Sequence, residues 1–407
     1  MQNIPSKNIK IIVLVSALGY FVDIYDLILF GIVRVASLKS LGIIDDVGLR
    51  ETGVYLLNMQ MGGMLLGGIL WGVLGDRRGR VSVLFGSIIM YSLANLLNGM
   101  VQDIPQYAVL RFVAGIGLAG ELGAGVTLVS EVMSKESRGW GTTIIATVGL
   151  LGAVVAFLVS DIFDWRTAYY VGGVMGLLLL FMRMGMYESG MFRNILDQKV
   201  KRGYFHELFT NRARFIKYLH CILIGVPLWY VVGILVVFSN DFASALNVEG
   251  VIPGKAIMYC YIGLAIGDLT SGYLSQVFRT RKKVIIAFII FTNILVIIYL
   301  FLNNFGTFYF YLLCVILGIG CGYWAVFVTN ASEQFGTNLR ATVTTTVPNF
   351  VRGAVVPLTT LFQLFITPLG IIYSALVVGM IAFVLAYYSI SRLEETYGKD
   401  LNYVEMI

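Results

Sequence analysis

Long apolar runs, each of roughly 20 residues, follow one another along this chain about twelve times, and each matches a helix that crosses a bilayer. Only short polar joints separate most of these runs. The runs lie near residues 9–34, 52–74, 81–101, 105–133, 139–161, 165–187, 214–239, 255–277, 283–303, 306–333, 340–367 and 369–391. Alternation of polar and apolar residues with a period of two is absent, so a membrane β-barrel is not expected. The runs therefore predict an all-α membrane protein with twelve transmembrane helices.

The composition supports a membrane protein and leaves no room for an extra globular domain. Of the 407 residues, 58% are apolar and 13% are charged, whereas a soluble domain is about half apolar and a quarter charged. The longest polar break divides the runs into two sets of six. We therefore expect an N-terminal bundle at 1–187, a cytoplasmic linker at 188–213, a C-terminal bundle at 214–391 and a cytoplasmic tail at 392–407.

The basic residues are distributed unevenly between the two sides of the predicted membrane. The net charge is +6, but most lysines and arginines fall in alternate joints and at the two chain ends. Only five lie in the segments of the opposite side: Arg34, Lys39, Arg50, Arg166 and Lys255. Since positive joints face the cytoplasm, both termini are predicted there. We interpret the charge as an orientation signal in a bacterial inner membrane, with the lipid bilayer and no nucleic acid as partner.

Signals for metal, cofactor or cleavage are lacking in the sequence. Cys221, Cys260, Cys314 and Cys321 lie in apolar runs without the spacing of metal ligands. The first run carries two aspartates and no convincing cleavage site, which favours a retained helix over a signal peptide. We expect neither a metal nor a cofactor.

The turn between the second and third runs reads Gly-Val-Leu-Gly-Asp-Arg-Arg-Gly-Arg, from Gly72 to Arg80. A turn this polar is expected at a membrane surface. Its glycines let the two helices approach closely and let the chain turn sharply between them. It resembles the loop signature of the major facilitator superfamily, and the resemblance extends over nearly the whole chain. Members have two pseudo-symmetric six-helix bundles with a central site between them.

The sequence repeats itself between its two halves, as that resemblance implies. The segment 72–76 recurs as 272–276, with Gln276 in place of Asp76, and a Glu…Arg pair at 131 and 138 recurs at 333 and 340. By resemblance, charged residues at the cytoplasmic helix ends form networks that close the inner side in the outward-open state. These residues are Asp76, Arg77, Arg80, Glu131, Arg138, Glu333 and Arg340.

Two aspartates lie inside the first apolar run. Asp23 and Asp26 are three residues apart and share one helix face, so in a desolvated site they repel and one is expected to hold a proton. The segment 19–31 resembles the first helix of metabolite–proton symporters, which implies proton coupling. The structural alternative is a fixed ion pair with Arg111.

The fourth run carries charge at two depths. Arg111 enters from outside, and Glu121 lies about 15 Å deeper along a helix. Arg111 can pair with Asp26 or Asp23, or bind an anionic substrate group, while Glu121 is a reserve proton carrier. The same run spells GxGxxG from Gly115 to Gly120, but no strand precedes it. We expect close helix packing there and no dinucleotide site.

The second half places Asp268 in the eighth run and Arg352 in the eleventh. A salt bridge between these two is slightly favoured, and the functional alternative makes Arg352 a substrate anchor. Further candidates for lining a cavity are Asn58, Gln60, Trp229, Tyr230, Tyr323, Trp324 and Asn349.

The sequence contains no Walker-type loop and no cluster of histidines or cysteines, so an enzyme is not expected. Paired intramembrane charges and a two-fold repeat favour alternating access over a channel. We predict a secondary active transporter for proton-coupled uptake of a small polar or anionic metabolite, an organic acid or amino acid, acting as a monomer. The fifth run lacks the Gly-Pro motif of drug-exporting relatives, which favours uptake. The alternative is a proton-driven exporter of a metabolite, siderophore or drug, and a neutral sugar stays open as substrate.

Overall fold

The computed structural model describes residues 6–133, 138–183 and 205–399, and its regular elements in these ranges are all helical. The all-α prediction is confirmed. The first half contains α1 (Ser6–Ser40), α2 (Asp46–Arg78), α3 (Arg80–Asn98), α4 (Ile104–Leu118), α5 (Glu121–Val132), α6 (Arg138–Ile162) and α7 (Trp165–Arg183). The second half contains α9 (Glu207–Thr210), α10 (Arg212–Tyr230), the π-helix η1 (Val231–Val236), α11 (Ser239–Ala245), α12 (Pro253–Val277), α13 (Lys282–Phe301), α14 (Thr307–Cys321), α15 (Trp324–Glu333), α16 (Thr337–Gly353) and α17 (Val355–Arg392).

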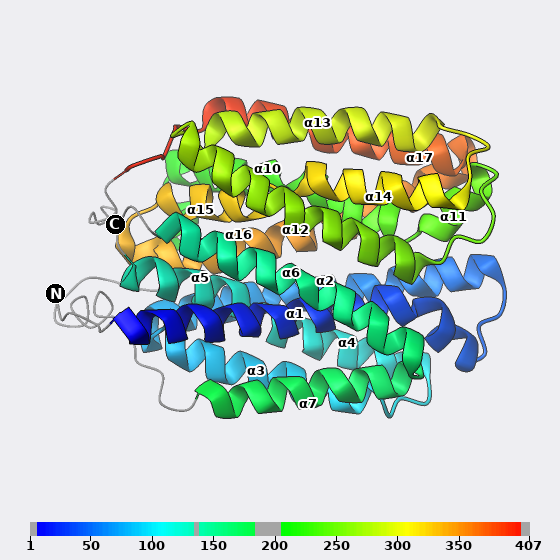
Figure 1. The fold of residues 1–407 in the computed structure, drawn as a ribbon, viewed down its shortest axis with the longest axis horizontal. Helices are drawn as coiled ribbons and strands as arrows, with labels where there is room; N and C mark the ends of the chain where they lie inside the picture. Colours follow the sequence, from blue (N-terminus) through cyan, green and yellow to red (C-terminus); the bar gives the residue numbers. More distant parts are fainter. Residues whose placement is uncertain (1–5, 134–137, 184–204, 400–407) are drawn as a thin grey trace.

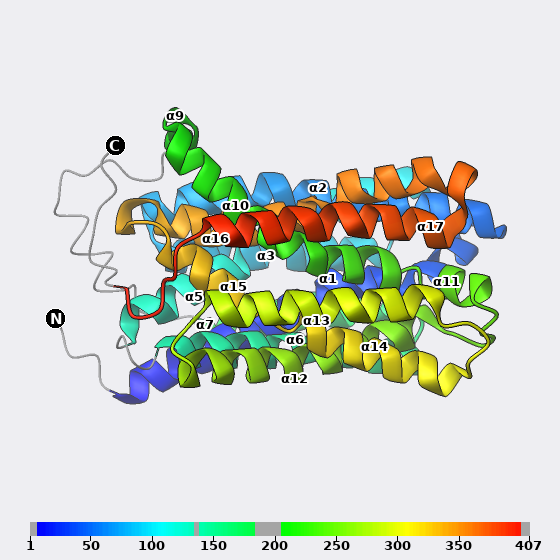
Figure 2. The same cartoon turned by 90° about the horizontal axis from the view of Figure 1, so that it is seen from above.

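The helices form two bundles that lie side by side (Figures 1 and 2). One bundle consists of α1 to α7, and the other of α10 to α17. They meet mainly along two helix pairs, α2 with α16 and α6 with α12, and also where α5 contacts α16 and α1 contacts α12. Helix α1 begins at the same end of the molecule at which α17 ends (Figure 1), so the described chain ends lie on one side of the predicted membrane.

Ten helical stretches in the described residues are long and apolar enough to cross a membrane. The last of them, Asn338–Arg392, holds two passes, because Gly370 adopts φ 73° and ψ 167° and breaks α17. A left-handed φ of this kind is accessible mainly to glycine. Helix α12 is a further pass of 25 residues that is less apolar, since it buries Asp268, Ser271 and Ser275. The predicted twelve passes are thus accounted for within the described ranges.

Several passes that read as continuous apolar runs are interrupted in the structure. The fourth is divided between α4 and α5 at Ala119 and Gly120, and the tenth between α14 and α15 at Gly322 and Tyr323. Both breaks occupy equivalent places in the two halves of the repeat. Broken backbone inside a membrane protein needs partners other than lipid, and buried side chains supply them at both breaks.

Glycines let the helices of each bundle approach closely. A Cβ atom added at Gly115 would lie 2.1 Å from the carbonyl oxygen of Gln60, and one at Gly318 would lie 1.9 Å from that of Cys260. Each distance is too short for any side chain, so α4 packs directly on α2 and α14 on α12. The GxGxxG of the fourth run therefore serves helix packing, as expected.

Candidate functional site

Arg352 lies on α16, a helix of the second bundle that packs on α2 of the first, and it is 1% exposed. Its guanidinium carbon is 5.7 Å from the ring centroid of Trp229 and 5.6 Å from that of Trp324. Nη2 lies 3.4 Å from the hydroxyl of Tyr20, and Nη1 lies 3.3 Å from Oδ1 of Asn349. The result is a buried cation with aromatic walls, and such walls attract a guanidinium through the ring quadrupole.

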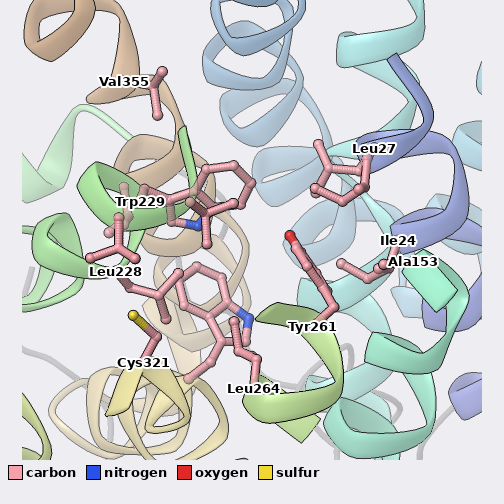
Figure 3. Packing of buried hydrophobic residues seen from close by; sticks show 14 of the residues in the cluster. Ile24, Leu27, Ala153, Leu228, Trp229, Tyr261, Leu264, Cys321 and Val355 are labelled. Atoms are coloured by element: carbon pink, nitrogen blue, oxygen red, sulfur yellow. The ribbon is translucent and has the colours of Figure 1, made fainter. Parts of the chain in front are cut away.

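Both bundles contribute to this cluster. The indole of Trp324 donates to the Tyr20 hydroxyl across the interface at 3.1 Å. Figure 3 shows Tyr261 of α12 between Trp229 of the second bundle and the first-helix residues Ile24 and Leu27. Since α1 belongs to one bundle and the tryptophans to the other, any movement between the bundles changes the surroundings of Arg352.

Asp23, Asp26 and Arg111 are each fully buried in the first bundle. The structure gives none of their side-chain nitrogen and oxygen atoms a hydrogen-bond partner. Arg111 instead lies over the rings of Phe30 and Tyr169, with its guanidinium carbon 5.4 and 5.7 Å from the centroids. The fixed ion pair between Arg111 and an aspartate, the structural alternative above, is not formed in this conformation.

Glu121 has a partner that the sequence did not indicate. Arg183, the last residue of α7, donates from Nη1 and Nη2 to the two carboxylate oxygens at 2.6 and 2.7 Å. Both side chains are almost completely buried. Ser87 Oγ lies 3.3 Å from the same carboxylate, and Arg183 Nη1 also donates to the carbonyl of Leu84 at 3.0 Å. Glu121 is therefore held in a bidentate ion pair. In the sequence, the feature that could have indicated a partner for Glu121 is that Arg183 lies inside the sixth apolar run.

The expected salt bridge between Asp268 and Arg352 is wrong. Asp268 Oδ1 accepts the backbone N–H of Ala325 at 3.1 Å, and its other oxygen has no hydrogen-bond partner in the structure. The carboxylate thus caps the start of α15 after the break in the tenth pass, where exposed N–H groups and the helix dipole favour an anion. Arg352 forms no salt bridge with this carboxylate.

The other polar candidates are distributed over the helix interfaces. Asn58 Oδ1 accepts from Thr359 Oγ1 at 3.0 Å and joins the two bundles. Gln60 donates to an α1 carbonyl at 3.1 Å, Tyr230 to an α17 carbonyl at 2.7 Å and Tyr323 to an α10 carbonyl at 3.1 Å. These three side chains satisfy helix backbone, so among the polar candidates Trp229, Trp324 and Asn349 are the ones gathered around Arg352.

Charged residues at the helix ends predicted to face the cytoplasm make contacts within and between the bundles. Asp76 accepts from the backbone N–H of Thr342 at 2.9 Å and from its hydroxyl, which joins α2 to α16. Glu333 lies 3.5 Å from Arg281 Nε and accepts from Thr396 at 2.8 Å.

The remaining residues of the expected charge network are Arg77, Arg80, Glu131, Arg138 and Arg340. Arg340 lies 3.4 Å from the carbonyl of Phe335, and Arg77 is exposed. The side chains of Arg80, Glu131 and Arg138 lie outside the described residues.

A second cluster joins the bundles at the opposite end and was missed by sequence reasoning. Arg34 of α1, 1% exposed, donates to Asn240 Oδ1 at 3.0 Å and to the carbonyl of Leu49 at 3.2 Å, and lies 3.9 Å from Asp241. Arg50 of α2 lies 3.8 Å from the same carboxylate. Asn240 and Asp241 belong to α11, so this Arg34 latch (Arg34, Arg50, Asn240 and Asp241) connects the bundles. With Asp76 and Thr342 in contact at the other end, Arg352 is enclosed from both sides.

The model of the Major Facilitator Superfamily matches residues 16–360. The chain belongs to this superfamily. It is 26% identical over 402 residues to the probable 4-methylmuconolactone transporter of Cupriavidus pinatubonensis, covering 93% of this chain and 89% of that protein. It is 25% identical over 314 residues to the putative niacin/nicotinamide transporter of Bacillus subtilis, covering 71% and 73%.

The fold also matches a solved structure of the superfamily. The proton:xylose symporter XylE, bound to 6-bromo-6-deoxy-D-glucose, superposes with a TM-score of 0.72 over 98% of both chains at 15% identity. That identity supports the two-bundle fold alone. Family membership makes this chain a membrane-spanning transporter of small molecules and not an enzyme.

Proposed function

We propose that this transporter takes up a small carboxylate metabolite together with protons, by alternating access to Arg352. The observation that supports this most is the enclosed guanidinium between the two bundles, whose direct contacts are Asn349, Tyr20 and two indole rings and include no salt bridge. A buried charge of this kind calls for an anionic ligand. Arginine matches a carboxylate with two parallel N–H donors.

The walls of the site favour a planar or unsaturated acid within that class. Trp229 and Trp324 present indole rings beside Arg352, and flat apolar ligands pack well on such rings. The names of the two relatives, a 4-methylmuconolactone and a niacin/nicotinamide transporter, agree with a compact ring-bearing metabolite. A neutral sugar would leave the guanidinium without a counter-charge.

Asp23 and Asp26 are the proposed proton carriers. Both are buried without hydrogen-bond donors, and an ionised carboxylate in such surroundings is costly. In the proposed cycle a proton enters from outside, the substrate settles against Arg352, and the bundles rock so that the site opens inward. Arg111 lies nearby as a counter-charge, while Glu121 is held by Arg183 until that pair opens.

The membrane arrangement completes the proposal. A bacterial inner membrane, both termini in the cytoplasm and the boundaries 1–187, 188–213, 214–391 and 392–407 agree with the basic joints of the sequence. Residues 188–204 of the linker and 400–407 of the tail lie outside the described residues. A single chain supplies both walls of the Arg352 cluster, which supports a monomer as the working unit. In the described part of the chain no observation favours the exporter alternative.

The test is a thermal-shift and uptake experiment with benzoate, nicotinate, nicotinamide, xylose and a primary amine. Benzoate and nicotinate should stabilise the purified protein, and the proton gradient should drive their accumulation in proteoliposomes. Arg352→Gln should weaken carboxylate binding by about tenfold to a hundredfold, equal to the loss of a charged hydrogen bond. Stabilisation by xylose or the amine alone would contradict the carboxylate assignment.

A further inference from the structure

Asn349 lies one helical turn before Arg352 on α16, and its side-chain amide is bonded on two sides. Oδ1 lies 3.3 Å from Arg352 Nη1, while Nδ2 donates to the carbonyls of Ala119 and Thr345, each at 2.7 Å. The side chain is 2% exposed. A single amide thus connects the proposed substrate anchor of one bundle to the backbone of the other.

The carbonyl that Asn349 reaches belongs to the break in the fourth pass. Helix α4 ends at Leu118 and α5 begins at Glu121, so Ala119 lies in the junction between them. A carbonyl at the end of a helix requires a donor from elsewhere, and the amide from the other bundle supplies it. The acceptor therefore lies two residues before the carboxylate that Arg183 holds.

Charged and titratable groups from three helices interact with Glu121. Arg183 of α7 holds the carboxylate, and Tyr91 of α3 and Asp23 of α1 interact with it electrostatically. Asp23 also interacts electrostatically with Arg352. The α4–α5 junction therefore lies between the substrate anchor and the acidic groups of the first bundle.

We propose that Asn349 is a positioning residue that transmits the occupancy of Arg352 to the α4–α5 junction, and so couples substrate binding to the Glu121–Arg183 pair. This inference rests on the proposed function, because it takes Arg352 as the carboxylate anchor. A bound carboxylate takes over the Nη1 donor and frees Oδ1 of Asn349. The amide then loses its fixed orientation toward Ala119, the start of α5 shifts, and Glu121 can separate from Arg183 and exchange a proton.

The chemistry requires an amide at this position. Asparagine offers both an acceptor for Arg352 and a donor for the carbonyl, which no aliphatic, hydroxyl or carboxylate side chain does at the same reach. Gly68 of α2 faces it, and a Cβ there would lie 2.9 Å from the Cβ of Asn349. The tight approach holds the amide where both contacts are made. Because linkage is reciprocal, the state of Glu121 must in turn alter the affinity for substrate.

The decisive experiment compares Asn349→Ala with Thr359→Val. The control removes another hydrogen bond between the bundles, that of Thr359 to Asn58, without touching Arg352 or Ala119. Benzoate and nicotinate are titrated into purified protein in two buffers of different ionisation enthalpy, so that calorimetry gives both the Kd and the protons exchanged. Accumulation under a proton gradient and counterflow without one are measured in proteoliposomes.

Asn349→Ala should bind carboxylate within about tenfold of the wild type, yet exchange protons at least about fivefold less on binding. It should keep counterflow and lose accumulation, whereas Thr359→Val should behave as the wild type. Asn349→Leu, similar in volume and without polar atoms, should share the defect, and Asn349→Gln should restore part of the coupling.

If Asn349→Ala does not fold, Asn349→Leu and Asn349→Gln test the role of Asn349 in proton coupling. Proton exchange equal to the wild type in both the Ala and Leu variants would overturn the role of Asn349 and leave the proposed function intact. A wild-type protein that binds no carboxylate, or binds one without any proton exchange, would instead refute the proposed function and this inference with it.

Discussion

The ion pair between Glu121 and Arg183 makes a strong prediction about stability. Two hydrogen bonds of 2.6 and 2.7 Å join side chains that are both nearly inaccessible. Removing one partner strands a buried charge, which costs about 3 to 5 kcal/mol. Arg183→Met should therefore lower the midpoint of thermal unfolding by roughly 4 to 6 °C for a chain of 407 residues. Glu121→Gln should cost less, because the amide oxygen still accepts one bond from Arg183.

The same pair predicts a large coupling in a double-mutant cycle. Glu121→Leu combined with Arg183→Met removes both charges, and buried pairs replaced by apolar groups are often nearly neutral. The double variant should be more stable than Arg183→Met alone. Unfolding in detergent can be followed with a thiol-reactive dye, since Cys221, Cys260, Cys314 and Cys321 are all buried and free. Additive effects of the two substitutions would refute the assignment of this pair as a mutually dependent buried lock.

Three further predictions concern other parts of the structure. Asp241→Asn should weaken the Arg34 latch and raise the labelling rate of a cysteine placed at that end of the interface; unchanged labelling would contradict the latch. Burial alone would raise the pKa of Glu395, but hydrogen bonds from Thr280 Oγ1 and from nearby backbone N–H groups outweigh it and lower that pKa. The ionised Glu395 therefore stabilises the fold above the ordinary glutamate pKa, and this contribution is lost as the pH falls through the lowered pKa. The wild type and Glu395→Gln should thus converge in stability in acid, and a stability difference that widens at low pH would disprove this. Asp268→Asn keeps an acceptor for the N–H of Ala325 and should retain transport, whereas Asp268→Leu should cost about 1 to 3 kcal/mol in thermal unfolding; equal stability of the two variants would exclude the capping role.

The passes of the fold could be predicted from the sequence because the bilayer imposes one length on every apolar run. The end of the eleventh run near 367 agrees with the break at Gly370. The interruptions inside the fourth and tenth passes could not be predicted in the same way. Residues 112–120 and 314–325 are apolar and glycine-rich, so hydropathy does not distinguish a broken helix from a continuous one.

The pairing of buried charges was the least predictable part of the site. Glu121 and Arg183 are 62 residues apart, and their meeting depends on the depth and rotation of α5 and α7, which residue spacing does not specify. Asp268 was expected beside Arg352 because both lie near mid-membrane. Its partner is instead a backbone N–H that exists as a free donor only because the tenth pass is broken. Charges inside spans could be found from sequence, but not their partners.

The two broken passes also show how a repeated fold becomes functionally asymmetric. At the break in the second bundle, Asp268 caps α15 from the same bundle, so that junction is satisfied whatever the other bundle does. At the break in the first bundle, the carbonyl of Ala119 depends on Asn349 from the opposite bundle. The backbone of the first junction therefore depends on contact between the bundles, whereas the N–H bonded by Asp268 at the second junction does not. The acidic groups Asp23, Asp26 and Glu121 all lie on that side, and this places the proposed proton chemistry where a change at Arg352 can reach it.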